Sequence, residues 1–135
     1  MARIAKRQRM MLVACSAQGT TLDAQIDPRL GRAQQFLLVD ADSLACEVIA
    51  NPNGNASGGA GIQVAQLLAS KGAQAVITGN CGPNAFATFH AAGIPVYTGA
   101  SGTIREALAQ YQRGELTAAA QPNVGGHFGD GRKAA

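Results

Sequence analysis

The sequence predicts a single α/β domain in which helices pack on a mixed, five-stranded sheet, and three observations lead to this fold class. The length of 135 residues and the apolar content of 47% suit one globular domain with one core. The first half carries apolar runs of strand length that indicate a hairpin. The second half alternates such runs with helix-patterned segments, which is typical of parallel strands joined by helices.

The first half supplies three predicted strands. Residues 10–16, "MMLVACS", form a continuous apolar run, as expected for a central strand buried on both faces. The polar segment Ala17–Ala33 follows; it is long for a connection in a compact domain, and such loops often carry function. Two further strand-like runs, 34–40 and 44–50, are separated by Ala-Asp-Ser, which predicts a β-hairpin. The segment 51–59, "NPNGNASGG", breaks regular structure.

The second half supplies two predicted strands and three helices. Residues 61–72 form a helix that ends at a glycine, 73–78 a strand, 83–92 a helix with proline at its first position, and 94–98 a strand. The last helix begins at a capping box, Thr103-x-x-Glu106, and ends at Gly114. Its apolar residues recur at helical spacing, at Ile104, Ala107, Leu108 and Tyr111.

The order of these elements predicts the topology. Right-handed crossovers between the later strands, added to the early hairpin, give the strand order 3-2-1-4-5 of a ribonuclease-H-like sheet with three helices. The predicted domain spans residues 1–116. Residues 117–135 lack periodicity and are rich in glycine and small side chains, so we expect a mobile tail.

Charge and cysteine content limit the class of function. The net charge of +3 is concentrated at the two ends of the chain, unlike a nucleic-acid footprint, which lines one face. Three widely spaced cysteines do not make a disulfide framework, so a cytoplasmic protein is expected. The apolar run before Cys15 is too short for a secretory signal, and no run is long enough to cross a membrane.

Three glycine-bearing loops are predicted to meet where the chain changes direction, between strands 1 and 4. Ligands of open α/β sheets favour this crevice, and helix N-termini with nearby glycines accept anions there. The loops are "CSAQGTTLD", "SGGAGI" and "GNCGPNA". The candidate binding residues in the second and third loops are Gly59, Ala60, Gly61, Gly79, Asn80, Gly82 and Asn84.

Cysteine and histidine side chains supply candidate metal ligands. Cys15 ends strand 1 and Cys81 follows strand 4, so their sulfur atoms are expected on the same rim of the sheet. Cys81 near a helix N-terminus should have some thiolate character, and thiolates bind copper, zinc and iron–sulfur species. His127 in the tail is a third candidate. Each cysteine is also open to interpretation as a small buried apolar side chain, the interpretation preferred for Cys46.

The loop before strand 2 adds positive charge. Arg29 and Arg32 either bind anions or pair with Asp23 and Asp27 in the same loop, and the sequence leaves both alternatives open. Enzymatic alternatives have less support. Strand 1 carries no carboxylates for a two-metal nuclease, and the chain contains no G-x-S-x-G, P-loop or H-E-x-x-H motif.

Four segments resemble the dinitrogenase iron–molybdenum cofactor-binding family, which includes nitrogenase cofactor carriers and the orange protein of sulfate reducers. They are "LDAQIDPRLGRAQQFLLVD", "NPNGNASGGAGIQVAQLLASKGAQAVITGNCGPNAF", "AAGIPVYTGASGTIREALAQYQRGEL" and "PNVGGHFG". The resemblance covers nearly the whole chain, and "GAGI…VITGNCGPNAF" is its most specific part.

The resemblance implies a ribonuclease-H-like fold without nuclease chemistry, and a metal–sulfur cluster of the molybdenum–iron or molybdenum–copper type. It implies a binding rim at residues 79–84, 59–61 and 29–32. We therefore expect a non-enzymatic carrier or assembly protein with cluster donor and acceptor proteins as partners, and no nucleic acid or membrane. The alternatives are a regulatory protein-interaction module and a small-anion-binding enzyme.

Overall fold

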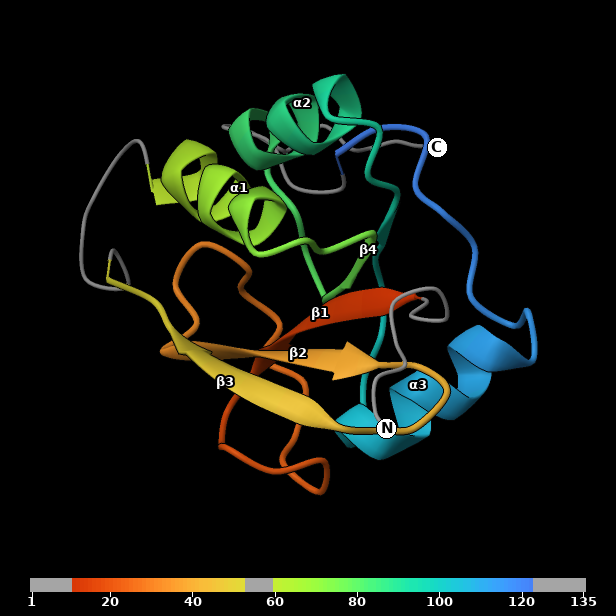
Figure 1. Ribbon diagram of the computed structural model, residues 1–135. Coiled ribbons are helices and arrows are strands. Elements are labelled where there is room, and N and C mark those ends of the chain that lie inside the picture. The colour runs from red at the N-terminus through yellow and green to blue at the C-terminus, as the bar shows by residue number, and fades with distance from the viewer. Residues whose placement is uncertain (1–10, 53–59, 123–135) are drawn as a thin grey trace.

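The computed structural model, which describes residues 11–52 and 60–122, contains one mixed sheet of five strands (Figure 1). The strands are β1 (Leu12–Ala17), β2 (Gln35–Asp40), β3 (Cys46–Ala50), β4 (Ala75–Ile77) and β5 (Val96–Tyr97). Their order, β3-β2-β1-β4-β5, confirms the predicted topology. β1 is central, as its unbroken apolar run predicts: it pairs antiparallel with β2 and parallel with β4.

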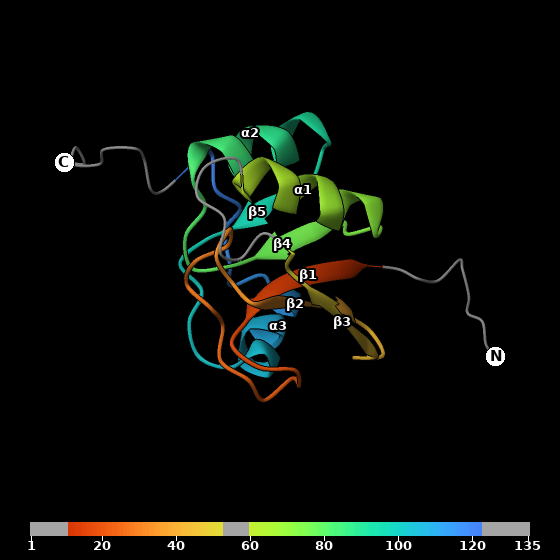
Figure 2. The same cartoon turned by 90° about the vertical axis from the view of Figure 1, so that its left-hand side faces the viewer.

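Helices cover both faces of the sheet (Figure 2). α1 (Ala60–Ser70) and α2 (Pro83–Ala91) lie over one face, and α3 (Ile104–Gln112) lies over the other. The capping box of α3 is formed as predicted, with Glu106 N donating to Thr103 Oγ1 at 3.0 Å and Thr103 N donating to Glu106 Oε1 at 2.9 Å. None of the helices in the described ranges is long and apolar enough to cross a membrane.

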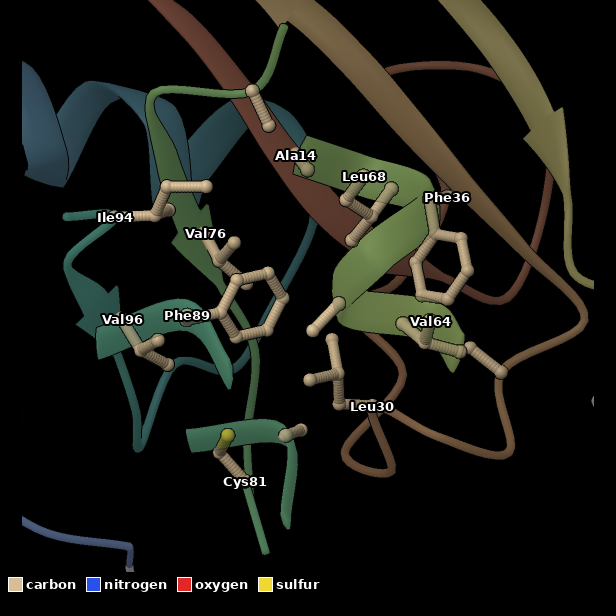
Figure 3. Packing of buried hydrophobic residues seen from close by; sticks show 14 of the residues in the cluster. Ala14, Leu30, Phe36, Val64, Leu68, Val76, Cys81, Phe89, Ile94 and Val96 are labelled. Atoms are coloured by element: carbon tan, nitrogen blue, oxygen red, sulfur yellow. The ribbon is translucent and has the colours of Figure 1, made fainter. Parts of the chain in front are cut away.

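The sheet separates two apolar layers. One layer joins the inner faces of α1 and α2 to the sheet, and its largest side chains include Phe36, Leu68 and Phe89 (Figure 3). The other joins α3 to the opposite sheet face through Leu37, Ile104, Leu108 and others. Because strand side chains alternate between faces, Ala14 belongs to the first layer while Val13 and Cys15 belong to the second.

Element bounds depart from prediction where turn geometry takes over. β3 begins at Cys46 instead of residue 44, because Leu44 adopts φ +65° in the hairpin turn. Asp40 holds this turn by accepting hydrogen bonds from the amides of Asp42 and Ser43. Past the predicted domain end, Ala119 N donates to Val96 O at 2.7 Å, so the first tail residues lie along β5. Residues 123–135 lie outside the described ranges.

Candidate anion cradle

The first turns of α1 and α2 meet at Gly61. A Cβ atom built on Gly61 would lie 3.3 Å from both Cβ and N of Ala85, in the first turn of α2. The two helices therefore begin side by side, and the partial positive charges of both N-termini fall on the same region. Gly61 and Ala85 belong to the second and third of the predicted glycine-bearing loops, whereas Leu22 of the first loop lies against the start of α3, where it accepts from Arg105 N.

The start of α2 offers amide groups that the protein itself leaves unused. Gly82 is the N-cap and supplies no side chain, and Pro83 has no N–H group. Within the described part of the chain, the amides of Asn84 and Ala85 have no hydrogen-bond acceptor, although Ala85 is only 3% exposed. The first amides of a helix have no partner within the helix, so these two groups are available to an external acceptor.

At the start of α3, by contrast, the first backbone amides all have acceptors within the chain. Ile104 N donates to Ala24 O at 2.9 Å, and Arg105 N donates to Leu22 O at 2.8 Å. Glu106 N donates to the Thr103 hydroxyl. Because all three amides are bonded to the chain, the first turn of α3 has no open donors like those of Asn84 and Ala85 in α2.

A wall of two loops stands beside these helix starts. A Cβ atom on Gly79 would lie 2.7 Å from Pro28 Cα, so only glycine allows this contact between the loops. Asn80 Nδ2 donates to Pro28 O at 3.0 Å, and Arg29 forms a parallel bridge with Asn80. We use the term anion cradle for the helix starts and this wall together. The cradle comprises Pro28, Arg29, Gly61, Gly79, Asn80, Gly82, Asn84 and Ala85.

The two arginines of the predicted rim have different environments. Arg29 pairs with Asp27: Nε lies 3.3 Å from Oδ1, and Nη2 lies 3.4 Å from Oδ2. Asp27 is buried at 2% exposure, whereas the Arg29 side chain is 60% exposed. Arg32 is exposed and pairs with no carboxylate of the described residues. The fourth member of the predicted set, Asp23, pairs with Arg105 of α3 instead.

A polar cleft adjoins the cradle at Arg29. Its volume is about 290 Å³, and it lies between the end of β1 and the start of β2. The residues that line it are Ala17, Gln18, Asp27, Arg29, Gln34 and Gln35. Arg29 thus borders both the cleft and the loop wall of the cradle.

The structure places the two candidate cysteine ligands apart. Cys15 is fully buried in the layer beneath α3, whereas Cys81 is fully buried in the layer beneath α1 and α2. The expectation that both sulfur atoms share one rim is therefore wrong, because Cys15 lies on the opposite face of the sheet. Figure 3 shows the Cys81 sulfur turned toward the apolar side chains of its layer.

The expected thiolate character of Cys81 is also wrong in this structure. Burial raises the pKa of Cys81 to about 12, and it raises the pKa of Cys15 to about 12 as well. The Cys81 thiol makes a weak hydrogen bond to Gly82 O, with 3.7 Å between the two atoms. Cys46, for which the sequence favours a small buried apolar side chain, is instead exposed on the edge strand β3.

Other predicted site residues fall partly outside the described ranges. Gly59 and His127 lie there, and of Ala60 only the backbone, as the first residue of α1, is described. Among the described residues, no group of three or more His, Cys, Asp or Glu side chains is arranged to hold a metal ion. The described donors are therefore backbone amides and guanidinium groups, which suit an anion.

Two polar residues of this region, Ser16 and Thr78, are not among the site residues that the sequence predicts. Ser16 and Thr78 are both fully buried, and their hydroxyl oxygens lie 2.7 Å apart beneath the Asp27–Arg29 turn. A signal was present, since each is a hydroxyl residue at the end of an apolar strand run, "LVACS" and "AVIT". A buried hydroxyl needs a partner, so such a position predicts a contact.

Comparison with known proteins identifies a family and solved structures with the same fold. The family model described as dinitrogenase iron–molybdenum cofactor matches residues 10–114. The apo form of the orange protein from Desulfovibrio gigas is 42% identical, with a TM-score of 0.82 over 85% of this chain and 98% of that one. A candidate NifB protein from Thermotoga is 38% identical, with a TM-score of 0.70 over 81% of this chain and 93% of that one.

A relative is also found among curated sequences. An uncharacterised protein of Methanocaldococcus jannaschii is 32% identical over 95 residues, which cover 68% of this chain and 80% of that protein. The matched residues 10–114 include β1 to α3 and every described residue of the cradle. This chain belongs to the dinitrogenase iron–molybdenum cofactor family.

Proposed function

We propose that the protein is a carrier for an anionic metal–sulfur cluster containing molybdenum with iron or copper, and that the cluster binds in the anion cradle. Membership of the family supports a cluster-binding or carrier role in general. The observation that carries the proposal is the open start of α2, where the amides of Asn84 and Ala85 have no acceptor within the described residues.

The donors of the cradle fit the surface of such a cluster. Sulfide atoms at the cluster surface carry negative charge and accept hydrogen bonds, and the cradle offers amides at two adjacent helix N-termini. Gly61 and Gly79 let the chain pack closely around the cradle, against Ala85 and Pro28, and Gly82 adds no side chain at the N-cap of α2, beside the open amides. Arg29, paired with Asp27, presents a guanidinium at the edge of the cradle, and the exposed Arg32 adds a positive charge three residues further along the same loop.

Metal ligation by Cys81 is a separate part of the proposal. Its thiol has a pKa of about 12, so a metal has to displace the proton before a bond to sulfur forms. We expect Cys81→Ala to weaken cluster retention if the bond forms. If Cys81→Ala retains the cluster as wild type does, Cys81 is not a ligand, and the backbone amides and arginines alone bind the cluster. Cys15, on the far face of the sheet, and His127 are tested in the same way.

Reconstitution tests the proposal directly. The apo-protein is incubated anaerobically with tetrathiomolybdate and copper, or with iron, molybdate and sulfide, and then separated by gel filtration. We expect charge-transfer absorption and molybdenum to co-elute with the protein. If neither elutes with the wild-type protein under any of these conditions, the cargo is not such a cluster.

Matched arginine variants locate the site. Arg32→Gln removes an exposed charge three residues after Arg29 of the cradle, and Arg113→Gln removes one at the end of α3. We expect Arg32→Gln to lower cluster retention and Arg113→Gln to leave it unchanged. Equal retention in both variants would mean that the cluster does not sit near the loop before β2. A carrier also implies donor and acceptor proteins, which pull-down with the loaded protein should capture.

One observation favours a second candidate function, a small-anion-binding enzyme. The polar cleft holds a buried carboxylate, Asp27, beside an exposed guanidinium, Arg29. A thermal shift with phosphate or nucleotides, combined with none for tetrathiomolybdate, would support this enzyme over the carrier.

A further inference from the structure

Three polar side chains are buried together under the cradle wall. Within the described residues, the buried polar or charged residues are Ser16 and Thr78, both at 0% exposure, and Asp27 at 2%. The Ser16 hydroxyl donates to Asp27 O at 2.6 Å, and its oxygen lies 2.7 Å from the Thr78 hydroxyl oxygen. Ser16 and Thr78 follow directly on the register pair Cys15 and Ile77 of β1 and β4, so their hydroxyl contact also links the ends of these two strands.

The direction of the hydrogen bonds follows from counting protons. Ser16 has one hydroxyl proton and gives it to the Asp27 carbonyl at 2.6 Å. The Thr78 hydroxyl therefore donates in the 2.7 Å contact with Ser16, which is much shorter than its 3.5 Å distance from the same Asp27 carbonyl. Asp27 N in turn donates to Ser16 O at 2.8 Å. Ser16 therefore holds both main-chain polar groups of Asp27, and Thr78 fixes the rotamer of Ser16.

Hydrogen bonds also link Asp27 to Arg29, the arginine at the edge of the cradle. Asp27 Oδ1 accepts from Arg29 N at 2.9 Å and from Arg29 Nε at 3.3 Å. The Asp27 carboxylate cannot swing away, because its side chain is only 4% exposed. The Arg29 backbone bridges to Asn80, so the same turn also sets the distance between the two loops of the wall.

We propose that Thr78, Ser16 and Asp27 act as positioning residues that hold the Arg29 guanidinium at the edge of the cradle before an anion arrives. This inference rests on the proposed function. Holding an arginine in one rotamer lowers the conformational entropy that binding has to remove, so the hydroxyl pair raises the affinity for anions without touching them.

A matched pair at position 78 tests the inference in the full chain. Thr78→Val keeps the shape and removes the hydroxyl, and Thr78→Ser keeps the hydroxyl. Tetrathiomolybdate binding is measured over a series of salt concentrations. We expect Arg29→Gln to lower affinity about tenfold and to reduce its salt dependence. Thr78→Val should reduce the salt dependence in the same direction, and Thr78→Ser should restore it.

The double variant decides between positioning and general loosening of the fold. If Thr78 acts through Arg29, then Thr78→Val in the Arg29→Gln background should lower the affinity no further. An additive loss, or an unchanged salt dependence in Thr78→Val, would overturn the inference. If Thr78→Val does not fold, Ser16→Ala, which removes the central hydroxyl, is judged by the same outcomes.

A measurement without ligand separates this inference from the proposed function. In the NMR spectrum of the apo-protein, we expect a slowly exchanging Arg29 Nε–H signal in wild type and Thr78→Ser, and its loss in Thr78→Val. An unchanged signal in Thr78→Val overturns the positioning role whatever the ligand. Absence of tetrathiomolybdate binding by wild type, with the NMR pattern as expected, overturns the cargo and supports the positioning role.

Discussion

Gly79 and Pro28 pack backbone to backbone, with space at position 79 for a hydrogen atom and for nothing larger. A Cβ there would lie 2.7 Å from Pro28 Cα and 3.2 Å from Pro28 O. Because both neighbours are backbone or ring atoms, they cannot move aside as the end of a flexible side chain would. The loop before β2 and the loop after β4 are joined through this contact.

Substitution of the two cradle glycines should produce a graded response. Gly79→Ala forces the loops apart and should lower the free energy of unfolding by about 1–3 kcal/mol. Gly61→Ala meets Ala85 at 3.3 Å, which a small shift of one helix relieves, so its cost should be smaller. Urea denaturation measures both. A larger loss for Gly61→Ala would contradict this account of the packing.

The buried thiols predict a loss of stability at high pH. Cys15 and Cys81 have pKa values of about 12 in the folded protein, above the ordinary value of 9.0 in the unfolded chain. The folded state therefore keeps protons that the unfolded chain releases. The resulting stabilisation is complete below about pH 9 and is lost as the pH rises toward 12.

Cysteine variants isolate this effect from other groups that titrate in the same range. The free energy of unfolding of Cys15→Ala or Cys81→Ala should fall less steeply than that of wild type above pH 9. One pH unit above the unfolded pKa, the difference should be roughly 1 kcal/mol per cysteine. Cys46→Ala is the control, because Cys46 is exposed. A wild-type slope in all three variants would show that burial does not raise the two pKa values.

Much of the fold can be predicted from local sequence patterns, but the face of the sheet on which a loop side chain lies cannot. The unbroken apolar run of β1 and the capping box at Thr103 each depend on a few neighbouring residues, so the sequence predicts them well. The side of the sheet that holds the Cys81 sulfur depends on how the turn after β4 leaves the sheet. No periodicity runs through "GNCGPNA" that could predict this direction. Topology does bring the start of α1 beside the turn after β4, through Gly61 and Ala85, whereas Leu22 of the first predicted loop is bonded to the start of α3.

The capping box offers a stability test that should leave anion binding untouched. Thr103→Ala removes the acceptor for Glu106 N and should lower the free energy of unfolding by about 1 kcal/mol. Since the amides of Ile104 and Arg105 are bonded to the loop before β2, no open anion site lies at α3. Cluster retention should therefore match wild type under conditions in which the variant is folded. If the folded Thr103→Ala variant lost the cluster, the anion site would lie at α3, and the assignment of the site to α2 would be wrong.

The N-cap of α2 should respond in opposite directions in stability and in binding. Gly82 has φ −77° and ψ 173°, an extended conformation that other residues adopt without strain. Gly82→Asp would place a carboxylate where it can accept from the open amides of α2, and it should raise the free energy of unfolding by a few tenths of a kcal/mol. The same carboxylate would occupy the donors and repel an anion, so cluster retention should fall steeply.

Gly82→Ser caps the amides without a charge and should have an intermediate effect on retention, which separates blocking from repulsion. Thr103→Asp, at the α3 N-cap, is the matched control and should retain the cluster like wild type. If Gly82→Asp retains the cluster as well as that control does, the open amides of α2 are not the anion site.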